Sequence, residues 1–172
     1  MKNKHLLLLL ITTIAACSTA KKIPIGNGGT VQVPSNARKI SIEEFNAANE
    51  KMEFSMGNLD NHYIIDNVLI AFRNVQNMPP NVESFEQRMK GMADVNFMNS
   101  GHRVSGMQLM NINNNQVLIS RLKGNKQISI YFSLRNATNK LTTNGVAEAA
   151  LSDSTKVDKI ADFIVKHVKF VD

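Results

Sequence analysis

QVLISRLKGNKQISIYFSLR, residues 116–135, carries the clearest secondary-structure signal in the chain. In its second half, residues 126–135, apolar and polar side chains alternate one by one. This alternation is typical of a β-strand that has one face in a core and the other partly in water. The first half, residues 116–123, is also rich in β-branched and apolar types, and Gly124-Asn125 between the halves predicts a two-residue hairpin turn.

The predicted turn fixes the register of the hairpin. A two-residue turn pairs Lys123 with Lys126 and places Ile119 opposite Ile130. The apolar side chains of both strands then share one face, so the pairing is internally consistent. We expect this face to be part of the core of a larger sheet.

Other short segments rich in β-branched and aromatic residues predict further strands. These segments are residues 30–34, 51–56, 63–66, 68–76 and 104–112. After the hairpin, Asn144-Gly145 lies in a polar segment and predicts a turn. The following residues, 146–151, fit either a strand or a helix.

Three segments have apolar residues at helical spacing. A short helix is expected over residues 41–50, where Ser41 and Glu44 have the form of a capping box. An amphipathic helix is expected in the segment that begins at Asn81. A C-terminal helix with a broad apolar stripe is expected after the polar cap Asp153-Ser154-Thr155. The expected fold class is therefore α+β: a mainly antiparallel twisted sheet with an internal amphipathic helix and a C-terminal helix packed on it.

The order of these elements is similar to that of the PsbP-like α/β/α sandwich family. The similarity covers residues 30–172 and rests on element order, the Asn144-Gly145 turn and a C-terminal helix that ends in VKHVKFVD. That family includes an extrinsic subunit of photosystem II and several bacterial envelope lipoproteins. The resemblance implies a binding or assembly module without intrinsic catalysis. It assigns no functional residues, because no family motif matches residue by residue.

The N-terminus MKNKHLLLLLITTIAAC, residues 1–17, predicts export. Its apolar run is too short to span a bilayer core of about 30 Å as a helix, so residues 1–16 are expected to be a signal peptide. Ile14-Ala15-Ala16-Cys17 resembles the bacterial lipobox, and the alternative is an ordinary signal with a chance cysteine. The resemblance implies a mature chain that begins at Cys17 and is anchored in the membrane by lipid on its sulfur and acylation, such as palmitate, on its new amino group.

Composition limits the partners of such a chain. Cys17 is the only cysteine, so no disulfide is expected. Residues 17–29 are small, polar and Gly-rich and predict a flexible tether, which leaves residues 30–172 as one α+β domain. Removal of the signal lowers the formal net charge from +6 to +4, and the remaining lysines are scattered, so nucleic acid is not an expected partner. No acidic run follows Cys17, which favours a periplasm-facing location, at the outer rather than the inner membrane.

Motifs for catalysis or metal binding are not found in the sequence. It contains no Gly-x-Ser-x-Gly nucleophile motif, and its histidines are too far apart for a zinc-binding pair. Asp60, His62 and Asp66 could form an acid/base cluster, but polar turn residues beside a strand are the commoner cause of such a group. Four methionines could bind Cu(I), although core packing explains them equally simply. They are Met89, Met92, Met107 and Met110. We therefore predict no metal, no cofactor and no enzymatic activity.

A partner-binding surface is a hypothesis for the polar face of the strand over 126–135. Ser129, Tyr131, Ser133 and Arg135 share this face, and tyrosine and arginine are frequent in interface hot spots. The alternative is an ordinary sheet face, half-exposed or covered by a helix. The leading interpretation is a lipoprotein that binds another envelope protein or helps to assemble a complex. The alternatives are an immunity lipoprotein that neutralises a periplasmic toxin, an envelope enzyme and a small-ligand binder; the oligomeric state is not predicted.

Overall fold

The computed structural model describes residues 20–50, 59–94 and 103–171. Cys17, the predicted signal peptide and the predicted strand over 51–56 lie outside the described residues. Among the described residues, no helix is long and apolar enough to cross a membrane.

Ten strands, three α-helices and one 3₁₀ turn make up the described chain. The strands are β1 (Ala20–Pro24), β2 (Thr30–Pro34), β3 (Arg38–Lys39), β4 (Asn61–Ile65), β5 (Val68–Phe72), β6 (Gln76–Asn77), β7 (Arg103–Ile112), β8 (Asn115–Lys123), β9 (Gln127–Arg135) and β10 (Leu141–Ala150). The helices are α1 (Ile42–Asn49), α2 (Phe85–Asp94) and α3 (Ser154–Lys166), and the 3₁₀ turn is η1 (Leu151–Asp153).

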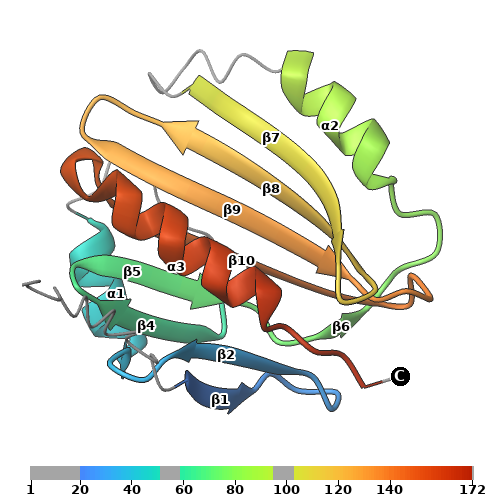
Figure 1. The fold of residues 1–172 in the computed structure, drawn as a ribbon, viewed down its shortest axis with the longest axis horizontal. Coiled ribbons are helices and arrows are strands. Elements are labelled where there is room, and N and C mark those ends of the chain that lie inside the picture. The colour runs from blue at the N-terminus through green and yellow to red at the C-terminus, as the bar shows by residue number, and fades with distance from the viewer. Residues whose placement is uncertain (1–19, 51–58, 95–102, 172) are drawn as a thin grey trace, which may run out of the picture.

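A twisted antiparallel sheet forms the centre of the molecule. Its strand order is β3-β4-β5-β10-β9-β8-β7, and β6 pairs with one end of β10. Helix α3 lies across β9 and β10 on one face, and α1 packs against β4 (Figure 1). The β1–β2 hairpin is a separate two-stranded sheet, joined to the C-terminal segment by backbone hydrogen bonds between Thr30 and Lys169. The predicted α+β class, with a C-terminal helix packed on an antiparallel sheet, is confirmed.

Two apolar clusters hold these layers together. The larger cluster lies between the sheet and α3, and it contains the buried stripe of that helix with the alternating apolar residues of β9. The stripe consists of Val157, Ile160, Ala161, Ile164 and Val165. The smaller cluster lies on the opposite face, where Phe45 of α1 packs with Leu69, Ala71 and Val146. Most of the hydrophobic stabilisation therefore comes from the α3 face.

The register of the β8–β9 hairpin differs from the predicted one by two residues. Ile119 pairs with Phe132 rather than with Ile130, and Lys123 pairs with Ile128. The Gly124 amide donates to the Gln127 carbonyl at 2.9 Å, so the turn is centred one residue later than predicted. Because side chains alternate with a period of two, this shift preserves which residues face the core.

Asn144-Gly145 does not form the predicted turn. Both residues lie within β10, a ten-residue strand that pairs with β5 and β9. Gly145 pairs with Phe72 and Phe132 on the neighbouring strands, and the ring of Phe132 occupies the space that a side chain would need. Nonlocal packing therefore outweighs the local turn preference of Asn-Gly. The ambiguous segment that follows continues as strand to Ala150.

The described part of the predicted tether is also structured. Ala20–Pro24 forms β1, and Ile23 and Ile25 are buried in the larger cluster. Gly26 and Gly28 adopt positive φ angles of 69° and 73°, so they shape a tight turn into β2 instead of loosening the chain.

Candidate functional site

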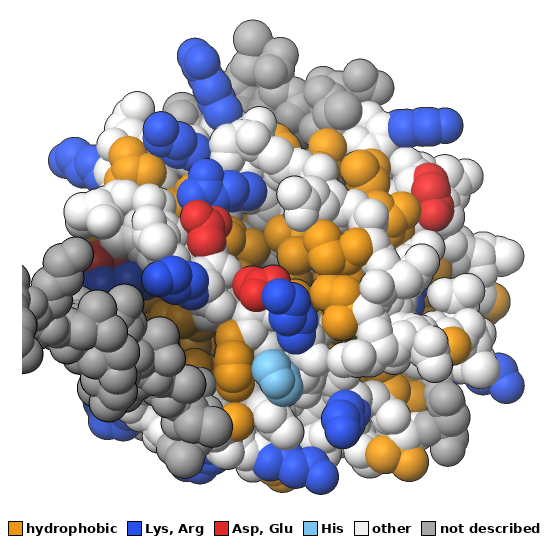
Figure 2. All heavy atoms as spheres, in the orientation of Figure 1, with side chains coloured by type: hydrophobic (Ala, Val, Ile, Leu, Met, Phe, Trp, Pro, Cys, Tyr) orange, Lys and Arg blue, Asp and Glu red, His pale blue; other side chains and the backbone are white. Residues whose placement is uncertain are grey.

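An open groove lies beside α3 on the face of the sheet that this helix covers. Helix α3 packs on β9 and β10, and no helix lies in front of β7 and β8 in Figure 1. We call this feature the α3–β7 groove. Its volume is about 260 Å³, and Met110, Ile119, Ile130 and Ala161 form the apolar part of its wall. Apolar side chains gather in the middle of this face, with charged side chains around them (Figure 2).

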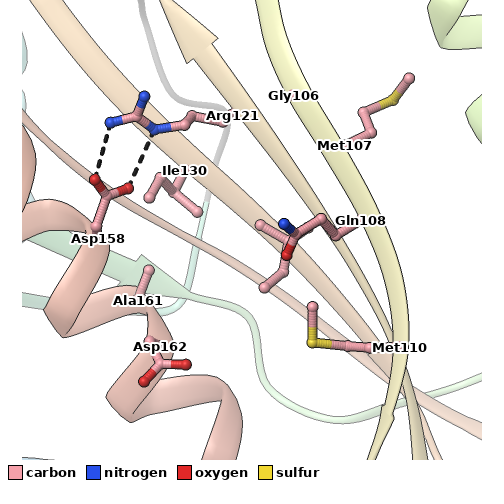
Figure 3. A pocket seen from close by; sticks show the side chains of 10 residues that line it. Gly106, Met107, Gln108, Met110, Arg121, Ile130, Asp158, Ala161 and Asp162 are labelled. Carbon is pink, nitrogen blue, oxygen red and sulfur yellow. Dashed lines mark hydrogen bonds and ion pairs between the residues drawn. The ribbon is translucent and has the colours of Figure 1, made fainter.

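Ion pairs neutralise the charged side chains of the groove. Arg121 of β8 makes a forked contact with Asp158 of α3, with its Nε and Nη2 atoms 3.1 Å and 2.9 Å from the carboxylate oxygens (Figure 3). Asp162, one turn further along α3, pairs with Lys166 at 2.7 Å. Both pairs are partly exposed, so they add little stability. Their effect is to leave a groove that suits an uncharged apolar group.

The methionines of β7 point in different directions. Met110 and Gln108 extend toward α3, whereas Met107 extends away from it (Figure 3). Their sulfur atoms do not converge on one point, as a Cu(I) site would require. Met89 lies on α2, and the side chain of Met92 is outside the described residues. Among the described side chains, no group of three or more His, Cys, Asp or Glu residues could hold a metal ion.

A buried carboxyl group lies on the opposite face of the sheet. Glu148 of β10 has no exposed surface, and its Oε2 accepts hydrogen bonds from Gln127 Nε2 at 3.0 Å and from Ser129 Oγ at 3.2 Å. Burial raises the pKa of Glu148 to about 7, against the two hydrogen bonds, which lower it. Glu148 is not among the residues predicted from the sequence, although a glutamate within the small apolar run Val-Ala-Glu-Ala-Ala is a signal of a buried carboxyl group.

The four residues of the hypothesised binding surface do not form one exposed face. Ser129 and Arg135 are buried, and Tyr131 and Ser133 are half-buried. Tyr131 packs beside the α1 cluster, and burial, with a smaller contribution from the Glu148 carboxylate, raises the pKa of its hydroxyl to about 12. Ser129 donates its hydroxyl hydrogen bond to the buried Glu148 carboxyl group. Ser129 and Tyr131 therefore pack into the interior of this face.

Arg135 connects the sheet to the first turn of α2. Its Nη2 donates to the Glu83 carbonyl at 2.8 Å, and its guanidinium carbon lies 3.9 Å from the centre of the Phe85 ring. Phe85 is the first residue of α2 and is buried. Burial lowers the pKa of Arg135, but arginine keeps its charge in this range.

Replacing Arg135 with alanine is expected to loosen α2. The change removes a charge-assisted hydrogen bond and a cation–π contact, which together predict a loss of about 2 kcal/mol in unfolding free energy. Urea unfolding measures the loss, and hydrogen exchange should show weaker protection at the start of α2. Arg88→Ala, an exposed change on the same helix, is the control. Equal protection of α2 in both variants would contradict the anchoring role.

The possible acid/base cluster does not assemble. His62 of β4 is buried with its ring 4.4 Å from that of Phe45, and its Nε2 has no hydrogen-bond partner among the described residues. Burial lowers the pKa of His62, opposed by the Asp60 carboxylate. Asp60 Oδ2 accepts from the Asn74 amide at 2.7 Å, and Asp66 lies in the turn between β4 and β5 with a φ of 45°. The Asp60 carboxylate therefore holds the loop after β5, whereas Asp66 is a turn residue between two strands.

Known structures share this fold. No protein family model matches the sequence, and no curated protein matches it. The solution structure of cyanobacterial PsbP (CyanoP) from Synechocystis sp. PCC 6803 is similar with a TM-score of 0.55 and 11% identity, over 91% of this chain and 95% of that one. The Ran-binding protein Mog1p of Saccharomyces cerevisiae is similar with a TM-score of 0.52 and 10% identity, over 90% and 97% of the two chains. The resemblance to the PsbP-like fold is therefore confirmed at the level of the fold.

Proposed function

We propose that this protein is a lipid-anchored envelope protein whose domain binds an apolar segment of a protein partner in the α3–β7 groove. The observation that carries the proposal is the open apolar wall between Met110 and Ala161, with its neighbouring charges already ion-paired. An apolar side chain that enters the groove would displace water from this wall without breaking an ion pair, which favours binding.

The size of the groove favours a protein segment over a free small molecule. Small-molecule sites usually enclose about 300–1,000 Å³ and bury most of their ligand. The α3–β7 groove offers about 260 Å³ and is open along one side. A side chain presented by another protein needs only such a shallow site. Mog1p, which has this fold, is named for binding Ran, so the fold is compatible with a protein partner.

The anchor part of the proposal rests on the N-terminal sequence. The lipobox-like Ile14-Ala15-Ala16-Cys17 supports lipid attachment at Cys17, the only cysteine of the chain. We expect the full-length protein to incorporate a palmitate analogue in cells and to fractionate with the outer membrane. Cys17→Ser should abolish the labelling and release the protein from the membrane fraction. Retention of the variant in the membrane would contradict lipid anchoring.

The groove is tested by photo-crosslinking in intact cells. A photoreactive amino acid at Asp162, on the α3 wall, should capture a specific protein, whereas the same group at Lys159, exposed on the same helix but outside the groove, should not. Gly106→Trp should reduce capture by roughly tenfold, because it places a large side chain in the groove. A Cβ at Gly106 meets no atom within 4 Å, so the variant is expected to fold normally. Equal capture with and without this substitution would exclude the groove as the binding site.

A further inference from the structure

A second groove lies at the end of the central sheet where the β7–β8 turn and the β9–β10 connection come together (Figure 1). It consists of two adjoining hollows of about 610 Å³ and about 360 Å³, which share Gln116 and Asn139 in their walls. The smaller hollow continues to the loop before α2. Both volumes lie in the range of about 300–1,000 Å³ that is usual for ligand sites. We call the two hollows together the amide groove.

The strands place the amide groove and the α3–β7 groove on opposite faces of the sheet. Gln116 of β8 pairs with Asn111 of β7 and with Arg135 of β9, so these three side chains share one face. Met110 and Val117, the neighbouring pair, belong with the larger apolar cluster under α3. Because side chains alternate along a strand, the strand residues of the amide groove face away from α3. This site is therefore distinct from the proposed partner-binding groove.

Side-chain amides form most of the lining. Of the seven residues that line the larger hollow, six are asparagine or glutamine, and the other is Ala137. The charged residues of the lining, Glu86 and Arg135, are both in the smaller hollow and have opposite signs. Glu86 also accepts a hydrogen bond from Gln116 Nε2 at 3.3 Å. The groove therefore presents a polar surface without net charge.

Turn geometry explains only some of these amides. Asn113, Asn114 and Asn139 have positive φ angles of 50°, 64° and 55°, a conformation that asparagine adopts more easily than most residues. Asn111 and Gln116, in contrast, face each other in the strands β7 and β8, where β-branched and aromatic residues are favoured. The backbone does not require an amide at either strand position. The polar lining therefore extends beyond what the turns need.

Several of the amides are available to a ligand. Asn113 Nδ2 donates to the Lys166 carbonyl at 2.8 Å and so has a structural role. The side-chain amides of Asn111, Asn114 and Asn139 have no hydrogen-bond partner among the described residues. Each of them offers both a donor and an acceptor to the groove.

Arg135 adds a buried donor to the smaller hollow. Only 7% of its surface is exposed, and its Nε has no hydrogen-bond partner within the described part of the chain. Buried donors without an acceptor are rare in folded proteins. This end of the groove therefore favours a ligand that carries oxygen acceptors.

We propose that the amide groove binds an uncharged carbohydrate chain. A sugar hydroxyl donates and accepts hydrogen bonds, as a primary amide does, so the two groups are complementary. Nucleic acid is disfavoured, because its phosphates need a basic surface. An extended peptide is disfavoured, because the larger hollow offers only Ala137 to apolar side chains. Met78, Pro79 and Val82 line the smaller hollow and suit the C–H groups of a sugar ring.

NMR titration of the full-length chain in detergent micelles tests the proposal. The probes are the uncharged tetramers of N-acetylglucosamine and of glucose, a tetramer of galacturonic acid, and a peptide of alternating glycine and alanine. We expect at least one uncharged tetramer to shift the side-chain amide signals of Asn111, Asn114 and Asn139. The acidic tetramer and the peptide should leave these signals unchanged. No shift with either uncharged tetramer, or equal shifts with the acid or the peptide, would overturn the proposal.

Glycine substitutions locate the binding site. The double change Asn114→Gly with Asn139→Gly removes two free amides and keeps the turns, because glycine tolerates positive φ angles. It should weaken binding of the active tetramer by roughly tenfold, through the loss of two hydrogen bonds. Asn67→Gly, at a φ of 68° in the β4–β5 turn, is the matched control and should bind as the parent does. Backbone amide signals away from the groove verify that each variant is folded. Equal affinities of the double variant and the control would overturn binding in the amide groove.

Discussion

Gly145→Ala is expected to lower the unfolding free energy by about 3 kcal/mol, at the upper end of the usual cost of overpacking a core. A Cβ at this position would overlap the ring of Phe132 and lie 2.9 Å from the carbonyl oxygen of Ala71. The ring cannot move aside easily, because Phe132 is buried beneath α3 in the larger cluster. The carbonyl is part of the β5–β10 ladder, so relief would also require the two central strands to separate.

Urea unfolding of Gly145→Ala, compared with the parent, measures this cost. Gly106→Ala is the matched control, since it also adds one methyl group to a strand glycine but meets nothing within 4 Å. The double change Gly145→Ala with Phe132→Leu should cost less than the sum of the two single changes, because the smaller side chain removes the overlap. An unfolding midpoint of Gly145→Ala equal to that of Gly106→Ala would show that the strands accommodate the methyl group.

The pH dependence of stability is expected to be dominated by Glu148. Its pKa in the folded protein is about 7, compared with an ordinary value of 4.5. The folded state therefore binds this proton more tightly than the unfolded state does. The stability that the proton contributes is fully present below about pH 4.5 and is lost as the pH rises through 7, a change of about 3 kcal/mol.

Glu148→Gln isolates this contribution. The amide resembles the neutral acid in shape, so the variant should lose the decline between pH 5 and 8 and exceed the parent above pH 7 by about 3 kcal/mol. His62 acts in the opposite direction, because its pKa is lowered and its contribution is lost as the pH falls. The difference between variant and parent, measured by urea unfolding at several pH values, removes the His62 contribution. Glu50→Gln, an exposed change, should leave the pH profile of the parent intact. If the stability of Glu148→Gln changed with pH in the same way as that of the parent, Glu148 would not be the source of the pH dependence.

The alternation of apolar and polar residues predicted the strands of the sheet well, because a strand with one buried face needs an apolar residue at every second position. In β9, Ile130 and Phe132 face the core, as the pattern indicates. The same pattern cannot fix the register, because a shift by two residues leaves both faces unchanged. The prediction of a turn at Gly124-Asn125 was wrong, because the central residues of the turn are Asn125 and Lys126.

Features that depend on distant parts of the chain could not be predicted. Gly145 follows an asparagine and precedes a valine, and nothing in its sequence neighbourhood indicates that the ring of Phe132 from the adjacent strand lies against it. The α3–β7 groove depends on where α3 crosses the sheet. The ion pair of Arg121 with Asp158 joins residues 37 positions apart, and it forms only because α3 lies beside β8. The predicted binding residues lie on the polar face of β9, where Ser129 and Arg135 are buried.

If Cys17 carries a lipid as proposed, the start of β1 would limit how the domain is presented at a membrane. Ala20, the first residue of β1, is three peptide units from Cys17, a separation of at most about 10 Å when fully extended. A lipid on Cys17 would therefore hold the β1–β2 hairpin close to the membrane. The C-terminal segment would be held there too, because it is bonded to the hairpin through Thr30 and Lys169. The domain would then have little rotational freedom and would meet partners by lateral diffusion. The β1–β2 hairpin would face the lipid, and the opposite end of the sheet would point away from the membrane.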